Sequence, residues 1–332
     1  MSEKRSFVSI LGPILARYLA LKEALGRRYS IERAVLKHLD TFLAQPHSTD
    51  LCAETFAQWC RTQEHLTSGV RRARMRIVRN FCLYRRRAEP GCFVPDADLF
   101  PPLHQPVQPH IFTKDEFATL LRIAATLRPA SNSPIRRETF RLALVLLYTT
   151  GLRRGELLRL LIGDYDPEER TLLVRESKFH KSRLLPLSSD GSREVEDYLR
   201  ARRARRLPVS RETPLLWSYE HGGRPYTENG LRTGISVLIK AAEIRTPAGR
   251  LPRLHDFRHT FAVQALMWWY RAGADVQAKL PFLAAYMGHV SIVSTQYYLR
   301  FVDELAGLAS VRFAKHCGSL VTAMPRTRGG DS

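Results

Sequence analysis

Acidic residues are scarce in this chain relative to basic ones. The 332 residues include 32 Asp and Glu against 52 Lys and Arg, which gives a formal net charge of +20 and a pI near 10.3. Solubility alone does not require so one-sided a charge. The excess of cations predicts a polyanionic partner bound through phosphate contacts, and nucleic acid fits this better than an anionic membrane surface.

Cysteine pairs with metal-binding spacing are also lacking. The chain has an odd number of scattered cysteines that form no CxxC pair and no Cys/His ligand pattern: Cys52, Cys60, Cys82, Cys92 and Cys317. Such a set is typical of reduced thiols and predicts neither a disulfide framework nor a zinc site.

Long hydrophobic runs are missing too. The apolar stretch Phe7–Ala16 is interrupted by Gly12 and Pro13 and is followed by Arg17. It is too short to cross a bilayer, and no small-residue cleavage site is evident. We therefore expect a cytoplasmic protein without a membrane partner.

The first third of the chain has the periodicity of helices. Apolar residues recur at helical spacing over 10–43, with a break at Gly26 that predicts two helices. Further helices are expected over 53–64 and 68–87.

The fourth of these helices carries two different faces. Val70, Ile77, Phe81 and Tyr84 repeat at helical spacing and should face a core. A second face is basic, and no acidic residue occurs between Arg71 and Ala88. This face is either a solvated surface or, as we expect, a phosphate-contacting one, and its residues are Arg72, Arg76, Arg79 and Arg86.

Prolines then crowd the segment that follows, which predicts a linker between two domains. A chain of this length is also expected to form more than one core. The predicted division is a DNA-binding domain over 1–100, a linker over 101–112 and a second domain over 113–332. Thr113 and Glu116 form the pattern of a capping box at the start of that second domain.

The sequence predicts a mostly helical second domain. A buried helix is expected over 139–150 with a stop at Gly151, and helical structure continues over 157–161. Residues 171–188 have apolar flanks around a polar centre, which predicts strand, turn and strand. A helix over 193–206, a loop over 207–227 and further helices complete the domain.

Polar residues that punctuate this domain are weak signals one by one. Each has an ordinary structural explanation, such as a surface cap, a turn lysine or a packing aromatic. Their joint presence in one basic protein is what gives them value: Arg153, Lys178, His255, Arg258, His289, Tyr297 and Tyr298.

Together these groups suit the transfer of a phosphodiester. Two guanidiniums can grip non-bridging oxygens and stabilise the charge of a pentacoordinate transition state. Imidazoles move protons near neutral pH, and a lysine can protonate a departing sugar oxygen. A tyrosine can be the nucleophile, although its phenol has a pKa of about 10 and needs help to ionise. No cluster of Asp and Glu with metal-ligand spacing accompanies them.

At this point four motifs resemble those of the tyrosine recombinases of the phage-integrase and Xer type. They are "TTGLRRGELLRL" with Arg153 and Glu156, "SKFHKSRLLPL" with Lys178, "HDFRHTFA" with His255 and Arg258, and "YMGHVSIVSTQYYL" with His289. In that family the nucleophile comes nine residues after the histidine. The resemblance therefore assigns this role to Tyr298, with Tyr297 as the rival one residue away.

The resemblance implies a mainly α fold of the α+β class. An N-terminal helical, SAM-like core-binding domain would precede a mainly helical catalytic domain with a small antiparallel sheet. Arg153, His255, Arg258 and His289 would be catalytic, Glu156 supporting, and Lys178 the general acid. The hairpin motif departs from the family's Gly-Lys-Gly pattern, because Ser177 and Phe179 flank the lysine, so Lys181 is an alternative acid. His259 is expected to be structural.

The implied function is site-specific recombination of double-stranded DNA through a 3′-phosphotyrosyl link. No metal and no ATP or other cofactor would be needed. The resemblance also implies a homotetramer on paired sites, with related recombinases or accessory factors as further partners, and a role such as transposition of a mobile element. Two alternatives stay open, a type IB topoisomerase and a non-cleaving DNA-binding accessory protein.

Overall fold

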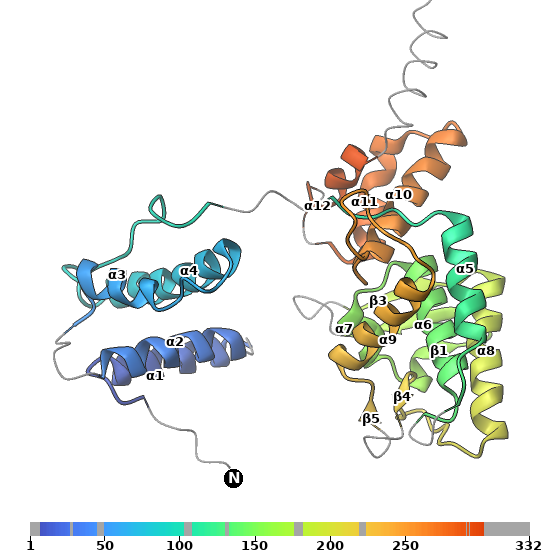
Figure 1. The fold of residues 1–332 in the computed structure, drawn as a ribbon, viewed down its shortest axis with the longest axis horizontal. Coiled ribbons are helices and arrows are strands. Elements are labelled where there is room, and N and C mark those ends of the chain that lie inside the picture. Colours follow the sequence, from blue (N-terminus) through green and yellow to red (C-terminus); the bar gives the residue numbers. More distant parts are fainter. Residues whose placement is uncertain are drawn as a thin grey trace, which may run out of the picture. The chain divides into compact units, whose positions relative to one another are not determined.

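The computed structural model describes most of the chain, and it divides into two compact units, residues 1–107 and 108–332 (Figure 1). The described residues are 7–26, 29–44, 50–102, 108–129, 133–175, 182–218, 224–289, 291 and 293–301. None of the helices in these ranges is both long and apolar enough to cross a membrane.

The first unit is built from four described helices around one apolar core. They are α1 (Gly12–Ala24), α2 (Ser30–Leu43), α3 (Ala53–Arg61) and α4 (Ser68–Arg85). The predicted break at Gly26 is confirmed, since its φ of 74° is a left-handed conformation that a helix does not continue through. Trp59 and Phe81 are fully buried at the centre of this core.

Helix α4 agrees with its predicted core face except at one position. Phe81 is buried, and Ile77 and Tyr84 pack against the core. The prediction for Val70 is wrong, because 46% of its surface is exposed. Burial on α4 begins at Met75, so the core does not extend to the first turn of the helix, where Val70 lies.

The segments on either side of the unit boundary are anchored to their own units. Nη1 of Arg72 donates to the carbonyl oxygens of Phe100 and Pro101, at 3.3 and 2.9 Å. In the second unit, the amide of Phe112 donates to Oγ1 of Thr260, and its ring stacks on that of Phe257.

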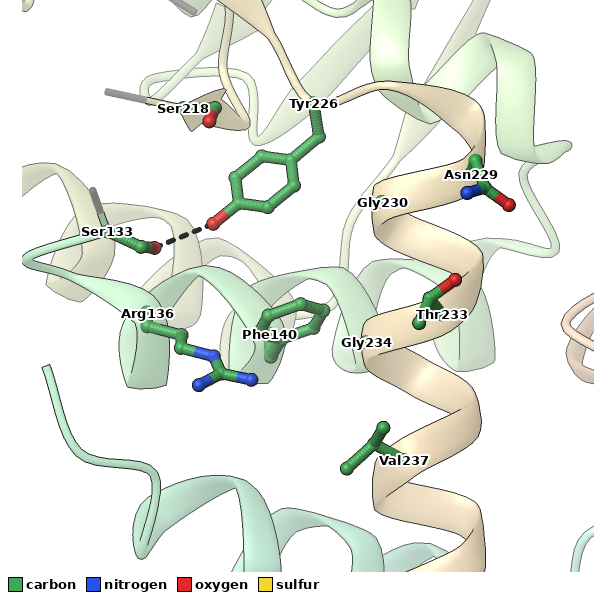
Figure 2. Close-up of a pocket in the computed structure, with 10 residues that line it drawn as sticks. All are labelled: Ser133, Arg136, Phe140, Ser218, Tyr226, Asn229, Gly230, Thr233, Gly234 and Val237. Atoms are coloured by element: carbon green, nitrogen blue, oxygen red, sulfur yellow. Dashed lines mark hydrogen bonds between the residues drawn. The ribbon is translucent and has the colours of Figure 1, made fainter. Parts of the chain in front are cut away.

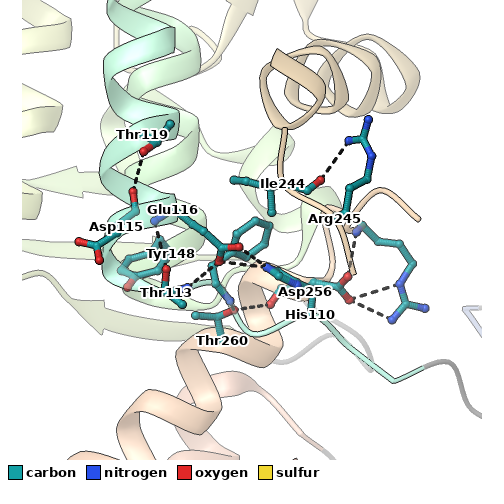
Figure 3. Close-up of polar contacts among 12 residues, drawn as sticks. His110, Thr113, Asp115, Glu116, Thr119, Tyr148, Ile244, Arg245, Asp256 and Thr260 are labelled. Atoms are coloured by element: carbon teal, nitrogen blue, oxygen red, sulfur yellow. Dashed lines mark hydrogen bonds and ion pairs between the residues drawn. The ribbon is translucent and has the colours of Figure 1, made fainter. Parts of the chain in front are cut away.

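Thr113 and Glu116 form the predicted capping box of α5 (Lys114–Ala125), which is therefore confirmed. Figure 3 shows this box beside His110, which contacts the Glu116 carboxylate, and beside the Asp256–Thr260 turn. This turn is the first of α10 (Asp256–Arg271). The segment that contains Phe112 therefore holds the N-terminal end of that helix.

The second unit is mostly helical with small antiparallel sheets, as the predicted fold class requires. Besides α5 and α10, its α-helices are α6 (Arg136–Thr150), α7 (Arg154–Arg159), α8 (Ser189–Ala204), α9 (Glu228–Ala241), α11 (Val276–Met287) and α12 (Val293–Gln296). Short 3-10 helices are η1 (Ile162–Asp164) and η2 (Tyr297–Phe301).

The predicted strand, turn and strand are confirmed in their two strands. β2 (Thr171–Val174) pairs with β3 (Arg183–Pro186) in antiparallel register, with Val174 opposite Arg183. β1 (Tyr165–Asp166) adds a third, short strand. The predicted turn, with Lys178 and Lys181, lies outside the described residues.

Two further points of the prediction needed correction or extension. The segment expected to be loop contains β4 (Trp217–Ser218) paired with β5 (Arg224–Pro225), and strands of two residues are too short to show an alternating pattern. The buried helix was expected to begin at 139, whereas α6 begins at Arg136. Gly151 ends α6 as predicted, with a left-handed φ of 60°.

Candidate active site

Three arginines converge on the C-terminal end of helix α11. The last carbonyls of a helix have no intrahelical donor and carry the negative end of its dipole, so cations bind there favourably. Here three successive carbonyls each accept from a guanidinium of a different element. The pairs are Arg183 with Tyr286, Arg258 with Met287 and Arg153 with Gly288, at 2.7, 2.6 and 2.8 Å.

The carboxylate of Glu156 joins two of these arginines. It accepts from Nη1 of Arg153 at 2.8 Å and from Nη1 and Nη2 of Arg183 at 3.1 and 2.9 Å. Its side chain is almost entirely buried. Burial by itself raises the pKa of Glu156, but the hydrogen bonds and charge of Arg183 and Arg153 reverse this and lower that pKa to about 2. Glu156 is therefore ionised at neutral pH.

Arg258 is the most deeply buried of the three arginines, with 2% of its surface exposed. Its Nη1 donates to the carbonyl oxygen of Gly151 at 2.7 Å, which ties α10 to the end of α6. Burial first, and then the charge of Arg153, lowers the pKa of Arg258 to about 10. The guanidinium remains protonated at neutral pH and is held rigidly by backbone oxygens.

Two glycines make this close packing possible. Gly151 has a φ of 60°, and a Cβ there would lie 2.6 Å from the ring of Phe261. Gly288 has a φ of 65°, and a Cβ there would lie 2.9 Å from Nη1 of Arg183 and 3.4 Å from Nη1 of Arg153. Any side chain at position 288 would displace the guanidiniums that surround it.

The imidazoles of the cluster are neutral at physiological pH. Burial, followed by the charge of Arg258, lowers the pKa of His255, which lies at the N-cap of α10. The same two causes, with Arg153 and Arg183 added, lower the pKa of His289 to about 4. Nδ1 of His289 is hydrogen-bonded to Oγ1 of Thr295 at 2.7 Å, which fixes the orientation of its ring.

The ring of His259 lies between those of His255 and Tyr298. Its ring centroid is 4.9 Å from that of His255 and 5.3 Å from that of Tyr298. Burial, and then the proximity of His255, lowers the pKa of His259 to about 4. Its Nδ1 is buried and makes no hydrogen bond within the described part of the chain.

Tyr298 is the tyrosine whose ring packs within the cluster. Only 3% of its surface is exposed, and its ring stacks on that of His289 with centroids 5.9 Å apart. Burial raises the pKa of the Tyr298 phenol, and the nearby charge of Arg258 offsets part of that rise. The phenol is therefore protonated at neutral pH in this structure.

Tyr297 occupies a different side of the same short helix. Both tyrosines begin η2, where successive residues point about 120° apart. Tyr297 is half-buried, with its ring centroid 6.0 Å from that of Tyr298 and 6.1 Å from that of His259. Tyr297 therefore lies at the edge of the cluster, whereas Tyr298 lies within it.

The predicted site residues thus fall into three groups. Arg153, Glu156, His255, Arg258, His289 and Tyr298 are brought together in the second unit. Lys178 and Lys181 lie outside the described residues. The arginines predicted to contact DNA belong to the first unit, where Arg76 and Arg86 are exposed and Arg72 and Arg79 are half-buried.

Sequence reasoning missed two members of the cluster. Arg183 was part of a quoted motif but was not selected, and Thr295 was not considered. Arg183 begins the second strand of the predicted hairpin, but that position does not reveal whether its guanidinium is buried. Thr295 had no comparable signal, because a single threonine near a histidine is common.

The arrangement can stabilise an anion and move a proton. Two rigid guanidiniums, Arg153 and Arg258, flank a phenol and neutral imidazoles, a set that suits the charge of a phosphoryl transition state. Within the described residues, no group of three or more His, Cys, Asp and Glu side chains is placed to hold a metal ion.

A cavity elsewhere in this unit has a different lining. It is a cavity of about 440 Å³ whose wall includes Ser133, Arg136, Phe140, Tyr226 and Asn229 (Figure 2). Ser133 and Tyr226 are hydrogen-bonded to each other at 2.8 Å. None of its lining residues belongs to the cluster around Tyr298, and its lining includes no carboxylate or imidazole for acid–base chemistry. The cluster around Tyr298 is therefore the candidate active site.

Comparisons with known proteins identify the family that the chain resembles. Residues 110–304 match the phage integrase family. The chain is 29% identical over 289 residues to "Putative integrase/recombinase y4rB" of Sinorhizobium fredii, which covers 87% of this chain and 92% of that protein. It is 31% identical over 164 residues to the tyrosine recombinase XerC of Listeria welshimeri, covering 49% of this chain and 50% of XerC.

Solved structures give the same picture for the fold. The integrase of transposon Tn1549, in complex with transposon right end DNA, superposes with a TM-score of 0.62 at 16% identity. The match covers 91% of this chain and 98% of the integrase chain. At that identity the likeness shows a shared fold.

Proposed function

This chain belongs to the phage integrase family and is a tyrosine recombinase, and we propose that it cuts and rejoins double-stranded DNA at specific sites through Tyr298. The observation that carries the proposal is the position of the Tyr298 phenol, which lies beside the charged Arg258 with its ring stacked on that of His289. The net charge of +20 supports DNA as the partner.

The proposed reaction is a transesterification in two steps. The Tyr298 oxygen attacks the scissile phosphorus and forms a 3′-phosphotyrosyl bond, while the bond to the 5′ oxygen breaks. A neutral imidazole of His255 or His289 accepts the phenol proton, and Lys178 protonates the departing 5′ oxygen, as the family resemblance implies. The 5′-hydroxyl of a partner strand then attacks the phosphotyrosyl bond and releases Tyr298. Each step exchanges one phosphate ester for another, so neither ATP nor a metal is required.

Arg153 and Arg258 have the complementary task of charge stabilisation. Both are held by backbone carbonyls before the substrate arrives, so little reorganisation is needed when negative charge grows on the phosphate oxygens. Glu156 orients Arg153, with which it shares a 2.8 Å ion pair.

We further propose that recombination takes place in a homotetramer on two paired DNA sites, with transposition or integration of a mobile element as its role. The similarity to the Sinorhizobium fredii protein over 92% of its length supports an integrase or recombinase of this type. The fold shared with a transposon integrase is consistent with the mobile-element role. Arg72, Arg76, Arg79 and Arg86 of the first unit are proposed to add phosphate contacts.

The test is incubation of the full chain with DNA that flanks its own gene and carries a nicked suicide site. We expect a denaturation-resistant protein–DNA adduct with the wild type and with Tyr297→Phe, and none with Tyr298→Phe. Loss of the adduct in Tyr297→Phe alone would move the nucleophile by one residue. Relaxation of supercoils without site dependence would favour the topoisomerase alternative, and absence of any adduct would favour an accessory protein.

A further inference from the structure

Arg183 is a buried member of the cluster to which neither the motifs nor the mechanism gives a role. We propose that Arg183 is a positioning residue for DNA cleavage, which fixes the Arg153–Glu156 pair and the turn before His289 relative to strand β3. The inference deepens the function proposed above and rests on it. Arg183 itself is not expected to touch the scissile phosphate.

The contacts of Arg183 join three parts of the second unit. Its Nε donates to the carbonyl of Tyr286 at 2.7 Å, and its two terminal nitrogens donate to the two oxygens of Glu156 at 3.1 and 2.9 Å. These partners are 103 and 27 residues away in the sequence. One rigid guanidinium thus holds the end of α11 and the start of α7 to the first residue of β3.

Burial separates this role from that of a phosphate-binding arginine. Only 12% of the Arg183 side chain is exposed, whereas 27% of the Arg153 side chain is exposed. The planar fork of Arg183 is already paired with a carboxylate, which is the geometry that guanidinium binds best. We infer that Arg153 is the member of this pair that is open to substrate, and that Arg183 holds its partner carboxylate in place.

Arg183 also lies close to two groups of the proposed reaction, His289 and Arg153. Nη1 of Arg183 would lie 2.9 Å from a Cβ at Gly288, the residue directly before His289. Oε1 of Glu156 is shared between Arg183 and Arg153, so a shift of one guanidinium moves the other. A misplacement of about 1 Å from a residue remote from the chemistry can lower a rate about 10²-fold.

The chain offers a matched control on the neighbouring strand. Arg175 follows β2 directly and forms an ion pair with Asp164, whose side chain is 2% exposed. Arg183→Gln and Arg175→Gln each remove a guanidinium from a buried carboxylate, but only the first touches the cluster. Both should lower the melting temperature, so loss of stability alone cannot distinguish them.

The first measurement is the single-turnover rate of adduct formation on a nicked duplex at saturating DNA, with the full chain. We expect Arg183→Gln to be about 10²-fold slower with unchanged DNA affinity, and Arg175→Gln to cleave at the wild-type rate. Arg183→Lys keeps the charge but not the planar fork. It should recover the melting temperature while its rate stays low. A rate that recovers together with the melting temperature, or a wild-type rate in both Arg183 variants, would overturn the positioning role.

A second measurement needs no DNA and separates this inference from the proposed function. The His289 imidazole is titrated by NMR, where burial, Arg258, Arg153 and Arg183 lower its pKa. Arg183→Gln should raise the His289 pKa and shift its resonances, and Arg175→Gln should leave both unchanged. If the wild type forms no adduct, the proposed function fails, and this titration still decides whether Arg183 organises the turn. An unchanged His289 in Arg183→Gln would overturn it.

Discussion

The arginines of helix α4 and those around helix α11 look alike in the sequence but differ in burial in the structure. In the first unit, Arg76 on α4 and Arg86 at its C-cap are exposed, and α4 contains no acidic residue. In the second unit, Arg258 is 2% exposed and bonded to two carbonyls. The first kind is free to contact a polyanion in many positions, whereas the second is held in one position by backbone carbonyls.

The comparison predicts that buried arginines govern rate and exposed ones govern affinity. The largest effect should come from Arg258→Ala, which in the proposed mechanism removes a rigid donor to the transition state. We expect the rate of adduct formation to fall by about 10²-fold to 10³-fold, with DNA affinity retained at moderate salt. Rate and affinity are measured separately, by single-turnover cleavage and by mobility shift. Loss of DNA binding in Arg258→Ala would contradict the prediction that buried arginines govern rate and exposed ones govern affinity.

A pH experiment sharpens the comparison on the side of the buried cluster. The pKa of Glu156 falls from its ordinary 4.5 to about 2 in the folded chain. Its stabilising contribution is therefore complete above pH 4.5 and is lost as pH falls through about 2. The contribution is on the order of 3 kcal/mol at pH 7.

Urea unfolding of the wild type and Glu156→Gln at pH 7 and at pH 3 tests this. The difference in the free energy of unfolding should be largest at pH 7 and should shrink at pH 3. A difference that does not change with pH would mean that the charge of Glu156 is not what stabilises the cluster.

A smaller effect is expected from Gly288→Ala, which asks how tightly the buried arginines are packed. The left-handed φ and the 2.9 Å approach to Arg183 both oppose a Cβ at this position. We expect a loss of about 1–3 kcal/mol in the free energy of unfolding, together with slower cleavage. Gly249→Ala is the control, since Gly249 also has a positive φ but no atom lies within 4 Å of its Cβ position. Equal cleavage rates in the two variants would show that the guanidiniums can move aside.

The smallest effects belong to the exposed arginines. Arg76→Ala should weaken DNA binding and reduce the slope of log K against log salt by about one, with cleavage at saturating DNA unchanged. Arg72→Ala differs, because Arg72 holds the carbonyls of Phe100 and Pro101 and its loss should destabilise the first unit. A salt titration combined with thermal melting distinguishes these outcomes. An unchanged slope in Arg76→Ala would remove this face of α4 from the interface.

Local signals predicted much of the fold because they depend on neighbours in the sequence. Gly26, Gly151 and the Thr113–Glu116 pair marked helix ends correctly, since a left-handed residue or a capping box acts within a few positions. Val70 failed for the opposite reason. Periodicity gives the direction in which a side chain points, but not whether the core extends that far along the helix.

The site was predictable only where a motif named its residues. The ordered motifs pointed to Arg153, His255, Arg258, His289 and Tyr298, which the structure gathers into one cluster. Arg183 escaped because its partners are 103 and 27 residues away and nothing local tells a buried guanidinium from an exposed one. Among so many basic residues, burial and partners are the only distinction, and both are properties of the tertiary structure.

The balance of charge around the end of helix α11 has a consequence for timing. Arg153, Arg183 and Arg258 face a single carboxylate, Glu156, while the imidazoles of His255, His259 and His289 are neutral. Among the described residues of the cluster, this leaves two positive charges unmatched before DNA binds. A bound phosphodiester would bring one negative charge, and the remaining positive charge would stabilise the further negative charge that develops on the phosphate oxygens midway through the exchange, so the site would favour the transition state over the bound ester.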